Sequence, residues 1–254
     1  MNYEKELTFA KALALEAGEI GRRYFSNGIA YENKSDNSPV TLADTQINDL
    51  VITKCLAEYP ESGVLGEEAS QAGKGHMLWV CDPIDGTFPY ALGLPASTFC
   101  LALVVDGVPE VGVVYDFNNG QLYSAIRGQQ AYMNDKPIVP STEQPMPVIN
   151  LEWFHAAKYN LQGTREKLFT KGFHVPNYSS CDIMAMRVAT GRIAGVIYAG
   201  DKSWDVAAAK VVVEACGGRV TDLTGHEQRY DGDIKGAIIA HPGYHDILLK
   251  ATEA

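Results

Sequence analysis

Residues 82–87 have the sequence Asp-Pro-Ile-Asp-Gly-Thr and follow an apolar run at 77–81. The run predicts a buried strand, because short apolar runs bounded by turn residues are typical of strands in a core. Pro83 fixes φ and lacks an amide hydrogen, so we expect strand pairing to end there, and Gly86 permits a sharp bend. Two carboxylates on a rigid strand end favour a hard divalent cation, although a turn in which Asp caps its own backbone has the same pattern.

The formal net charge of −10 over 254 residues argues against nonspecific binding to nucleic acid or to anionic membranes. Such a charge also repels an anionic substrate, unless bound cations invert the local field. No apolar stretch approaches the roughly 20 residues of a membrane span, and the N-terminus lacks the basic start and apolar core of a secretory signal. The five cysteines form no Cys-x-x-Cys pair, which predicts reduced, buried thiols in a cytoplasmic protein.

The first half of the chain contains two helical patterns and then a series of strand patterns. Apolar residues recur at three- and four-residue steps over 4–25, which predicts an amphipathic helix that Asn27-Gly28 ends. A polar loop at 34–39 separates it from a second helix that begins at Thr41. Short runs separated by Gly and Asn turns then predict an antiparallel meander, with strands at 98–105, 111–115, 121–126 and 130–133.

Four prolines between 137 and 147 crowd a polar stretch, which indicates a domain junction near residue 142. Beyond it, strands and helices alternate: strands at 148–151, 193–198 and 236–240, and helices at 182–190, 206–216 and 243–252. This pattern predicts an α+β to α/β protein of layered helices and sheets. We expect two subdomains, an N-terminal α+β unit at 1–141 and a C-terminal α/β unit at 142–254.

Further acidic groups lie outside the Asp-Pro-Ile-Asp-Gly-Thr stretch, and each has an ordinary structural explanation. Asp44 follows Thr41 by three residues, and we expect the pair to form a helix capping box. Glu67 and Glu68 fit a solvated turn, and Asp205 precedes an apolar helix whose positive dipole end it would face. Together, however, these groups place carboxylates at strand ends and helix starts, where one pocket could collect them.

The combination resembles the inositol monophosphatase family, within the superfamily of magnesium-dependent, lithium-sensitive phosphatases. The resemblance covers nearly the whole chain and rests on residues 38–44, 66–68, 82–87, 204–209 and 214–218. It implies a layered α-β-α-β-α sandwich of the inositol monophosphatase and fructose-1,6-bisphosphatase type. It also implies that the N-terminal unit holds most metal ligands, while the C-terminal unit supplies Asp205 and substrate contacts.

The resemblance implies two or three Mg²⁺ ions and hydrolysis by water without a phosphoenzyme. The implied oxygen ligands are Glu67, Asp82 and the Ile84 carbonyl for one ion, Asp82, Asp85 and Asp205 for a second, and Glu68 for a weaker third. Asp44 would hydrogen-bond Thr87, and both would orient the attacking water. Glu67 is the third implied catalytic residue, because it holds the ion that activates this water.

The implied substrate contacts are Asp85, Gly86, Thr87, Ser180, Asp182, Tyr198, Asp205 and Lys34. The amides of Gly86 and Thr87 would receive phosphate oxygens, and Lys34 would belong to a mobile flap. For Asp182 we favour a structural role, as the N-cap of the helix at 182–190.

Two departures from the family pattern bear on the substrate. Pro89 stands where many members have asparagine, and Tyr198 stands where inositol-specific members commonly have a glutamate that binds substrate hydroxyls. The substrate is therefore expected to be a small phosphorylated metabolite: inositol 1-phosphate, histidinol phosphate, fructose-1,6-bisphosphate or 3′-phosphoadenosine 5′-phosphate. Two alternatives remain: a metal-binding relative without catalysis, and a soluble α/β domain whose acidic turns are coincidental. Relatives are commonly dimers, so we expect a homodimer.

Overall fold

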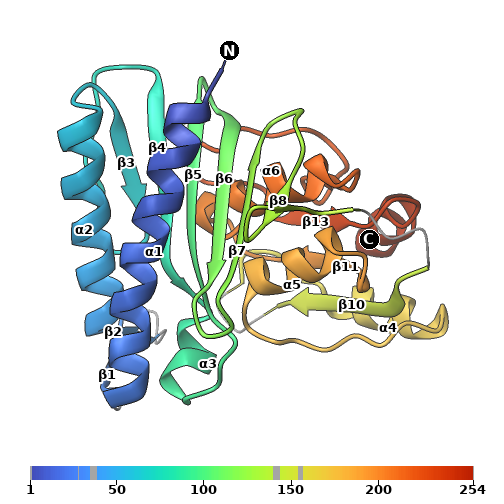
Figure 1. Cartoon of the computed structure of the whole chain (residues 1–254). Helices are drawn as coiled ribbons and strands as arrows, with labels where there is room; N and C mark the ends of the chain where they lie inside the picture. Colours follow the sequence, from blue (N-terminus) through green and yellow to red (C-terminus); the bar gives the residue numbers. More distant parts are fainter. Residues whose placement is uncertain (1, 28, 35–38, 140–143, 154–156, 254) are drawn as a thin grey trace.

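The computed structural model describes residues 2–27, 29–34, 39–139, 144–153 and 157–253. Two main sheets, of seven and four strands, alternate in it with three layers of helices, so the predicted α-β-α-β-α sandwich is confirmed (Figure 1). Helices α1 (Glu4–Asn27) and α2 (Leu42–Glu58) cover the outer face of the large sheet. Between the sheets lie α5 (Cys181–Ala189) and α6 (Ala207–Ala215), and α4 (Gln162–Thr170) and α7 (His245–Thr252) cover the small sheet.

The large sheet has seven strands in the order β3-β4-β5-β6-β7-β8-β9. Its first pair, β3 (Gly63–Gly66) and β4 (Met77–Asp85), is parallel. The remaining strands form the predicted antiparallel meander: β5 (Thr98–Val105), β6 (Val108–Asp116), β7 (Gln121–Ile126), β8 (Tyr132–Met133) and β9 (Lys136–Pro137). Because β3 and β4 are parallel, their carboxyl ends meet at one edge of the sheet, where the Glu67 amide donates to the carbonyl of Cys81, the residue before Asp82.

The prediction that strand pairing ends at Pro83 is wrong. Strand β4 continues to Asp85, which pairs with Thr98 after a register shift between Asp82 and Asp85. The irregularity takes Pro83 out of the ladder, so that its missing amide hydrogen costs no sheet hydrogen bond. Asp82 and Asp85 therefore lie on the same strand, on either side of the irregularity.

The small sheet has the order β10-β11-β13-β12. Strands β10 (Met146–Glu152) and β11 (Ile193–Tyr198) are parallel, while β13 (Ala237–Ala240) runs antiparallel to both β11 and β12 (Arg219–Thr221). Strand β12 and helix α4 have no counterpart in the sequence prediction. Neither shows a strong periodic pattern, and each is placed by a contact with another element: β12 pairs with β13, and α4 packs against α7.

Three sequence predictions fall on parts of the chain outside the described residues: the junction near residue 142, the Gly28 helix stop and most of the loop at 34–39. The division into 1–141 and 142–254 therefore stays a prediction. Two short strands, β1 (Tyr31–Asn33) and β2 (Pro39–Thr41), flank that loop as an antiparallel pair. Within the described residues, no helix is both long and apolar enough to cross a membrane.

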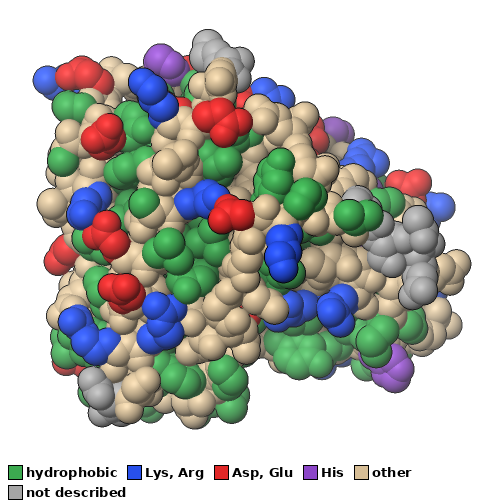
Figure 2. Space-filling model, in the orientation of Figure 1, with side chains coloured by type: hydrophobic (Ala, Val, Ile, Leu, Met, Phe, Trp, Pro, Cys, Tyr) green, Lys and Arg blue, Asp and Glu red, His purple; other side chains and the backbone are tan. Residues whose placement is uncertain are grey.

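Apolar side chains fill the space between each pair of neighbouring layers. All five cysteines are buried and free, as predicted. The face of the molecule in Figure 2 carries acidic and basic side chains that are interspersed among apolar ones. The net negative charge is thus accompanied on this face by basic groups, rather than gathered there into one acidic region.

Gly112 in β6 brings helix α6 into direct contact with the backbone of the large sheet. A Cβ atom at this position would stand 2.4 Å from the carbonyl oxygen of Ala208, far inside normal contact distance. Glycine is therefore required for this close approach. The start of α6, and with it Asp205, is thereby held against the large sheet that carries Asp82 and Asp85.

We predict that Gly112→Ala lowers the free energy of unfolding by about 1–3 kcal/mol, because the added methyl group forces α6 away from β6. Urea denaturation followed by circular dichroism measures the change. The matched control is Gly163→Ala in the exposed helix α4, where an added Cβ meets nothing within 4 Å. That variant should be neutral or more stable by about 0.5–1 kcal/mol, and an equal loss in both variants would contradict the packing argument.

Candidate metal centre

Three carboxylates from two distant parts of the chain converge at the end of β4. Asp82 and Asp85 come from that strand and are 2% and 4% exposed. Asp205 comes from a short 3₁₀ turn, η1 (Ser203–Asp205), which leads into α6. One carboxylate oxygen from each residue lies within 4.8 Å of the others. The structure thus brings together the three residues predicted to share one cation.

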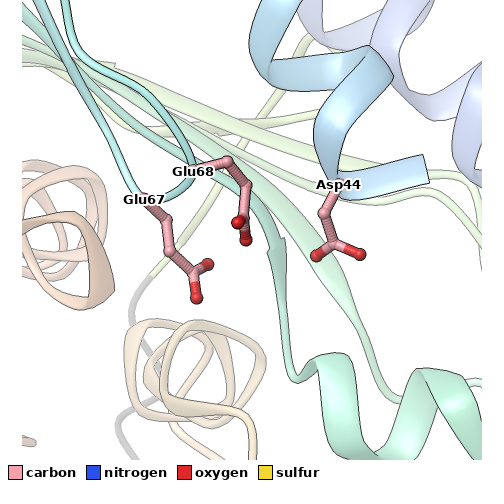
Figure 3. Close-up of side chains that lie close together, drawn as sticks. All are labelled: Asp44, Glu67 and Glu68. Carbon is pink, nitrogen blue, oxygen red and sulfur yellow. The ribbon is translucent and has the colours of Figure 1, made fainter. Parts of the chain in front are cut away.

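A second acidic group lies at the same edge of the sheet and contains Asp44, Glu67 and Glu68. Figure 3 shows their carboxylates directed into one space, from the first turn of α2 and from the turn after β3. Their ligand oxygens also lie within 4.8 Å of one another. The Lys34 ammonium contacts Glu67 at 2.8 Å and Glu68 at 2.6 Å. A positive charge is therefore already present at this position.

The charges of the two groups act on one another. Burial raises the pKa of Asp82 well above its usual range, and Glu67, Asp205 and Asp85 raise it further. Oδ1 of Asp82 is buried and has no hydrogen-bond partner among the described residues. A hard cation at this oxygen would both satisfy it and offset the repulsion. The donor set, all carboxylate with one nearby carbonyl, therefore fits Mg²⁺.

Asp85 also anchors the start of helix α5. It accepts hydrogen bonds from Ser180 Oγ at 2.5 Å, from the amides of Cys181 and Asp182 at 3.0 Å, and from Thr98 Oγ1 at 3.2 Å. Burial raises the pKa of Asp85, and these donors oppose the rise. No local pattern in the sequence signals this contact, because Asp85 and the helix are almost one hundred residues apart.

The predicted capping box at the start of α2 is present and adjoins Thr87. Oδ2 of Asp44 accepts from the Thr41 amide at 2.8 Å and from Thr41 Oγ1 at 2.5 Å. Its Oδ1 lies 3.4 Å from the hydroxyl of Thr87, and the Ile84 carbonyl lies 3.0 Å from the same hydroxyl, whose single hydrogen can go to either acceptor. Burial raises the pKa of Asp44 to about 7, and Glu67 and Glu68 add to the rise. Capping and the contact with Thr87 therefore use different oxygens of one carboxylate.

Gly86 and Pro89 form the turn that follows the acidic strand. Gly86 has φ +82°, and a Cβ there would stand 2.8 Å from the Ala96 carbonyl, so glycine is needed. A short helix, α3 (Thr87–Ala91), follows. Pro89 lies in its first turn, where amides have no partner within the helix. The departure at Pro89 thus costs the local geometry nothing.

Asp182 does not have the N-cap role that we expected. Ser180 is the N-cap of α5, and Asp182 lies in the first helical turn. Its side chain is fully buried, and neither carboxylate oxygen has a hydrogen-bond partner among the described residues. The N-cap prediction fails because the helix begins one residue earlier, at Cys181, and Asp85 accepts the amides of Cys181 and Asp182 in its first turn.

Tyr198, a predicted substrate contact, and Glu152, which was not predicted, are both buried and contact other predicted site residues. The hydroxyl of Tyr198 donates to Oδ2 of Asp205, and burial raises the pKa of Tyr198 well above its usual value, so it remains a donor. Glu152 at the end of β10 accepts from the Ser180 amide at 3.2 Å, and burial raises its pKa to about 7. Glu152 was not predicted, since a lone carboxylate at a strand end has no distinguishing sequence pattern.

The sequence model of the Inositol monophosphatase family matches residues 2–254, and this chain belongs to that family. It is 32% identical to the inositol-1-monophosphatase ImpA of Mycolicibacterium smegmatis, over 87% of this chain and 82% of that protein. It is 30% identical to a histidinol-phosphatase of Chlorobaculum parvum, over 90% of each chain. It is 31% identical to the Nus factor SuhB of Salmonella typhimurium, over 90% and 89%.

A solved structure supports the same conclusion about the fold. The crystal structure of an IMPase/NADP phosphatase complexed with Mg²⁺ and phosphate has a TM-score of 0.83 and 27% identity, and the likeness covers 96% of this chain and 94% of that one. The family is magnesium-dependent, which agrees with the all-oxygen donor set described above.

We predict that Asp82→Asn raises the free energy of unfolding in EDTA by about 1–2 kcal/mol, because it removes one charge from a buried group of like charges. The same variant should lose the stabilisation that Mg²⁺ gives the wild type. Thermal melts with EDTA and with Mg²⁺ measure both effects.

The matched control for this prediction is Asp116→Asn. Asp116 is equally buried, but it accepts hydrogen bonds from Asn119 and lies 3.7 Å from Arg187. Its replacement should lower stability with and without Mg²⁺. If Asp82→Asn were destabilising in EDTA to the same degree, the repulsion argument would be wrong.

Proposed function

We propose that this protein hydrolyses a small phosphate monoester with Mg²⁺, by direct attack of water and without a covalent phosphoenzyme. The observation that carries the proposal is the convergence of Asp82, Asp85 and Asp205 within 4.8 Å. Relatives named as phosphatases support it. Burial raises the pKa of every cysteine thiol, so a cysteine nucleophile has no support.

The ions would be held by the predicted ligands: Glu67, Asp82 and the Ile84 carbonyl for one, Asp82, Asp85 and Asp205 for another, and Glu68 for a weaker third. When bound, Mg²⁺ would lower the pKa of a water molecule and neutralise negative charge on the phosphoryl oxygens. The Lys34 ammonium between Glu67 and Glu68 supports the assignment, because it already occupies a position suited to a cation.

Asp44 and Thr87 would orient the attacking water. With the Ile84 carbonyl held by an ion, the one hydroxyl hydrogen of Thr87 would go to Asp44, which would leave the Thr87 oxygen free to accept a hydrogen bond from the water. The water would then be directed by two side chains that are themselves fixed, Asp44 by the capping box and Thr87 by the start of α3. The amides of Gly86 and Thr87 would donate to phosphate oxygens.

The residues near Asp205 do not select one alcohol as the leaving group of the phosphate ester. The phenol of Tyr198 offers no charged acceptor, and its hydroxyl already donates to Asp205. Ser180 and Asp182 are 1% and 0% exposed, so their side chains face inward in this conformation. Inositol 1-phosphate, histidinol phosphate, fructose-1,6-bisphosphate and 3′-phosphoadenosine 5′-phosphate remain candidate substrates.

We also propose that the protein is a cytoplasmic homodimer. Each subunit would be divided into an N-terminal subdomain at 1–141 and a C-terminal subdomain at 142–254. Dimers are the commonest soluble oligomers, and five free, buried thiols suit a reducing compartment. The proline-rich stretch around 137–147 supports the position of the division.

Phosphate release from the four candidate substrates tests the reaction. We predict release with Mg²⁺, its loss in EDTA and its inhibition by Li⁺, with one substrate hydrolysed far faster than the others. If Mg²⁺ raised the melting temperature while no substrate released phosphate, the protein would instead be a metal-binding relative without catalysis.

The role of the Thr87 hydroxyl can be isolated with a pair of variants. We predict that Thr87→Val lowers kcat by about 100-fold or more with little change in KM, because the side chain keeps its shape and loses the group that orients water. Thr87→Ser retains the hydroxyl and should keep most of the activity. Equal loss of activity in the two variants would assign Thr87 to packing rather than to catalysis.

A further inference from the structure

Tyr198 is a buried tyrosine with a polar contact at the metal centre. It ends strand β11, and its side chain is 4% exposed. Its hydroxyl donates to Oδ2 of Asp205, which lies seven residues later in the chain. A phenol buried at this depth and bonded to a candidate ligand calls for an explanation beyond packing, because phenylalanine would pack equally well.

The backbone between the two residues is shaped around the phenol. The amide of Lys202 donates to the phenolic oxygen at 3.4 Å. A Cβ atom at Gly200 would stand 2.1 Å from the same oxygen, so a residue with a side chain would displace the ring. The backbone of the loop at 199–202 therefore holds the phenolic hydroxyl in place.

The contact with Tyr198 helps to hold the Asp205 carboxylate in place against repulsion by its neighbours. Asp205 ends a three-residue 3₁₀ turn, and one of its carboxylate oxygens lies within 4.8 Å of oxygens of two like-charged carboxylates, Asp82 and Asp85. A lysine in contact with Asp205 would hold it but would also neutralise it. A neutral donor holds the carboxylate and leaves its negative charge available to a cation.

We propose that Tyr198 is a positioning residue, whose phenol holds the Asp205 carboxylate in the orientation that lets it share a Mg²⁺ ion with Asp82 and Asp85. The inference rests on the proposed function and extends it. It assigns the hydroxyl of Tyr198 to a metal ligand and not to the substrate. The chain thus uses a tyrosine for a task that the sequence pattern left open.

Titration calorimetry of metal-free protein with MgCl₂ tests the proposal. Tyr198→Phe should weaken Mg²⁺ binding about tenfold, since outer-shell partners of metal ligands typically change affinity by 10–100-fold. In an Asp205→Asn background, the same substitution should cause no further weakening, because the phenol no longer has a carboxylate to position. At saturating Mg²⁺, the KM of Tyr198→Phe for the phosphate ester should equal that of the wild type.

The matched control is Tyr230→Phe. Tyr230 is fully buried, and its hydroxyl has no hydrogen-bond partner among the described residues, so its loss should leave Mg²⁺ affinity unchanged. Unaltered Mg²⁺ affinity in Tyr198→Phe would overturn the proposal, as would a raised KM at saturating Mg²⁺, which would place the hydroxyl on the substrate. If the wild type itself bound no Mg²⁺, the proposed function would fail as well, which distinguishes the two failures.

Discussion

The structure depends on holding carboxylates together in a place where they repel one another. Asp82, Asp85 and Asp205 are close enough to share one ion, and Asp82 and Asp85 are almost fully buried. Removing such charges from water costs several kcal/mol each unless they are paired or neutralised. The surrounding elements offset part of this cost with neutral donors: the start of α5 for Asp85 and the phenol of Tyr198 for Asp205. A bound cation would offset the rest.

The layered fold is what makes this arrangement rigid. The irregularity in β4 places two of the carboxylates on one strand, and parallel pairing with β3 brings Glu67 to the same edge. The two helices between the sheets, α5 and α6, supply the remaining contacts from their N-terminal ends. Gly112 allows α6 to lie directly on the large sheet. The packing of α5 and α6 between the sheets therefore also determines the geometry of the carboxylates.

Local patterns predicted what local forces decide. The long amphipathic helix α1, the antiparallel meander and the capping box of Asp44 follow from periodicity and turn chemistry within a few residues. Pro83 and Asp182 were misinterpreted for a common reason. An irregularity between Asp82 and Asp85 accommodates the proline, and Asp85, 97 residues before Asp182, accepts the Asp182 amide in a helix that begins one residue earlier than predicted. Contacts between distant segments override local preferences, and a single sequence does not encode them in any readable spacing.

The carboxylates of the metal centre are chemically alike but not equivalent. Both oxygens of Asp85 accept hydrogen bonds from the α5 region, so its replacement would disturb the docking of that helix along with any ion. Asp82 is different, because its Oδ1 is buried and has no hydrogen-bond partner within the described part of the chain. A carboxylate that the protein leaves unsatisfied is the one for which a cation is the natural partner. Replacement of Asp85 would thus affect both folding and metal binding, whereas replacement of Asp82 would report on metal binding without the loss of a helix contact.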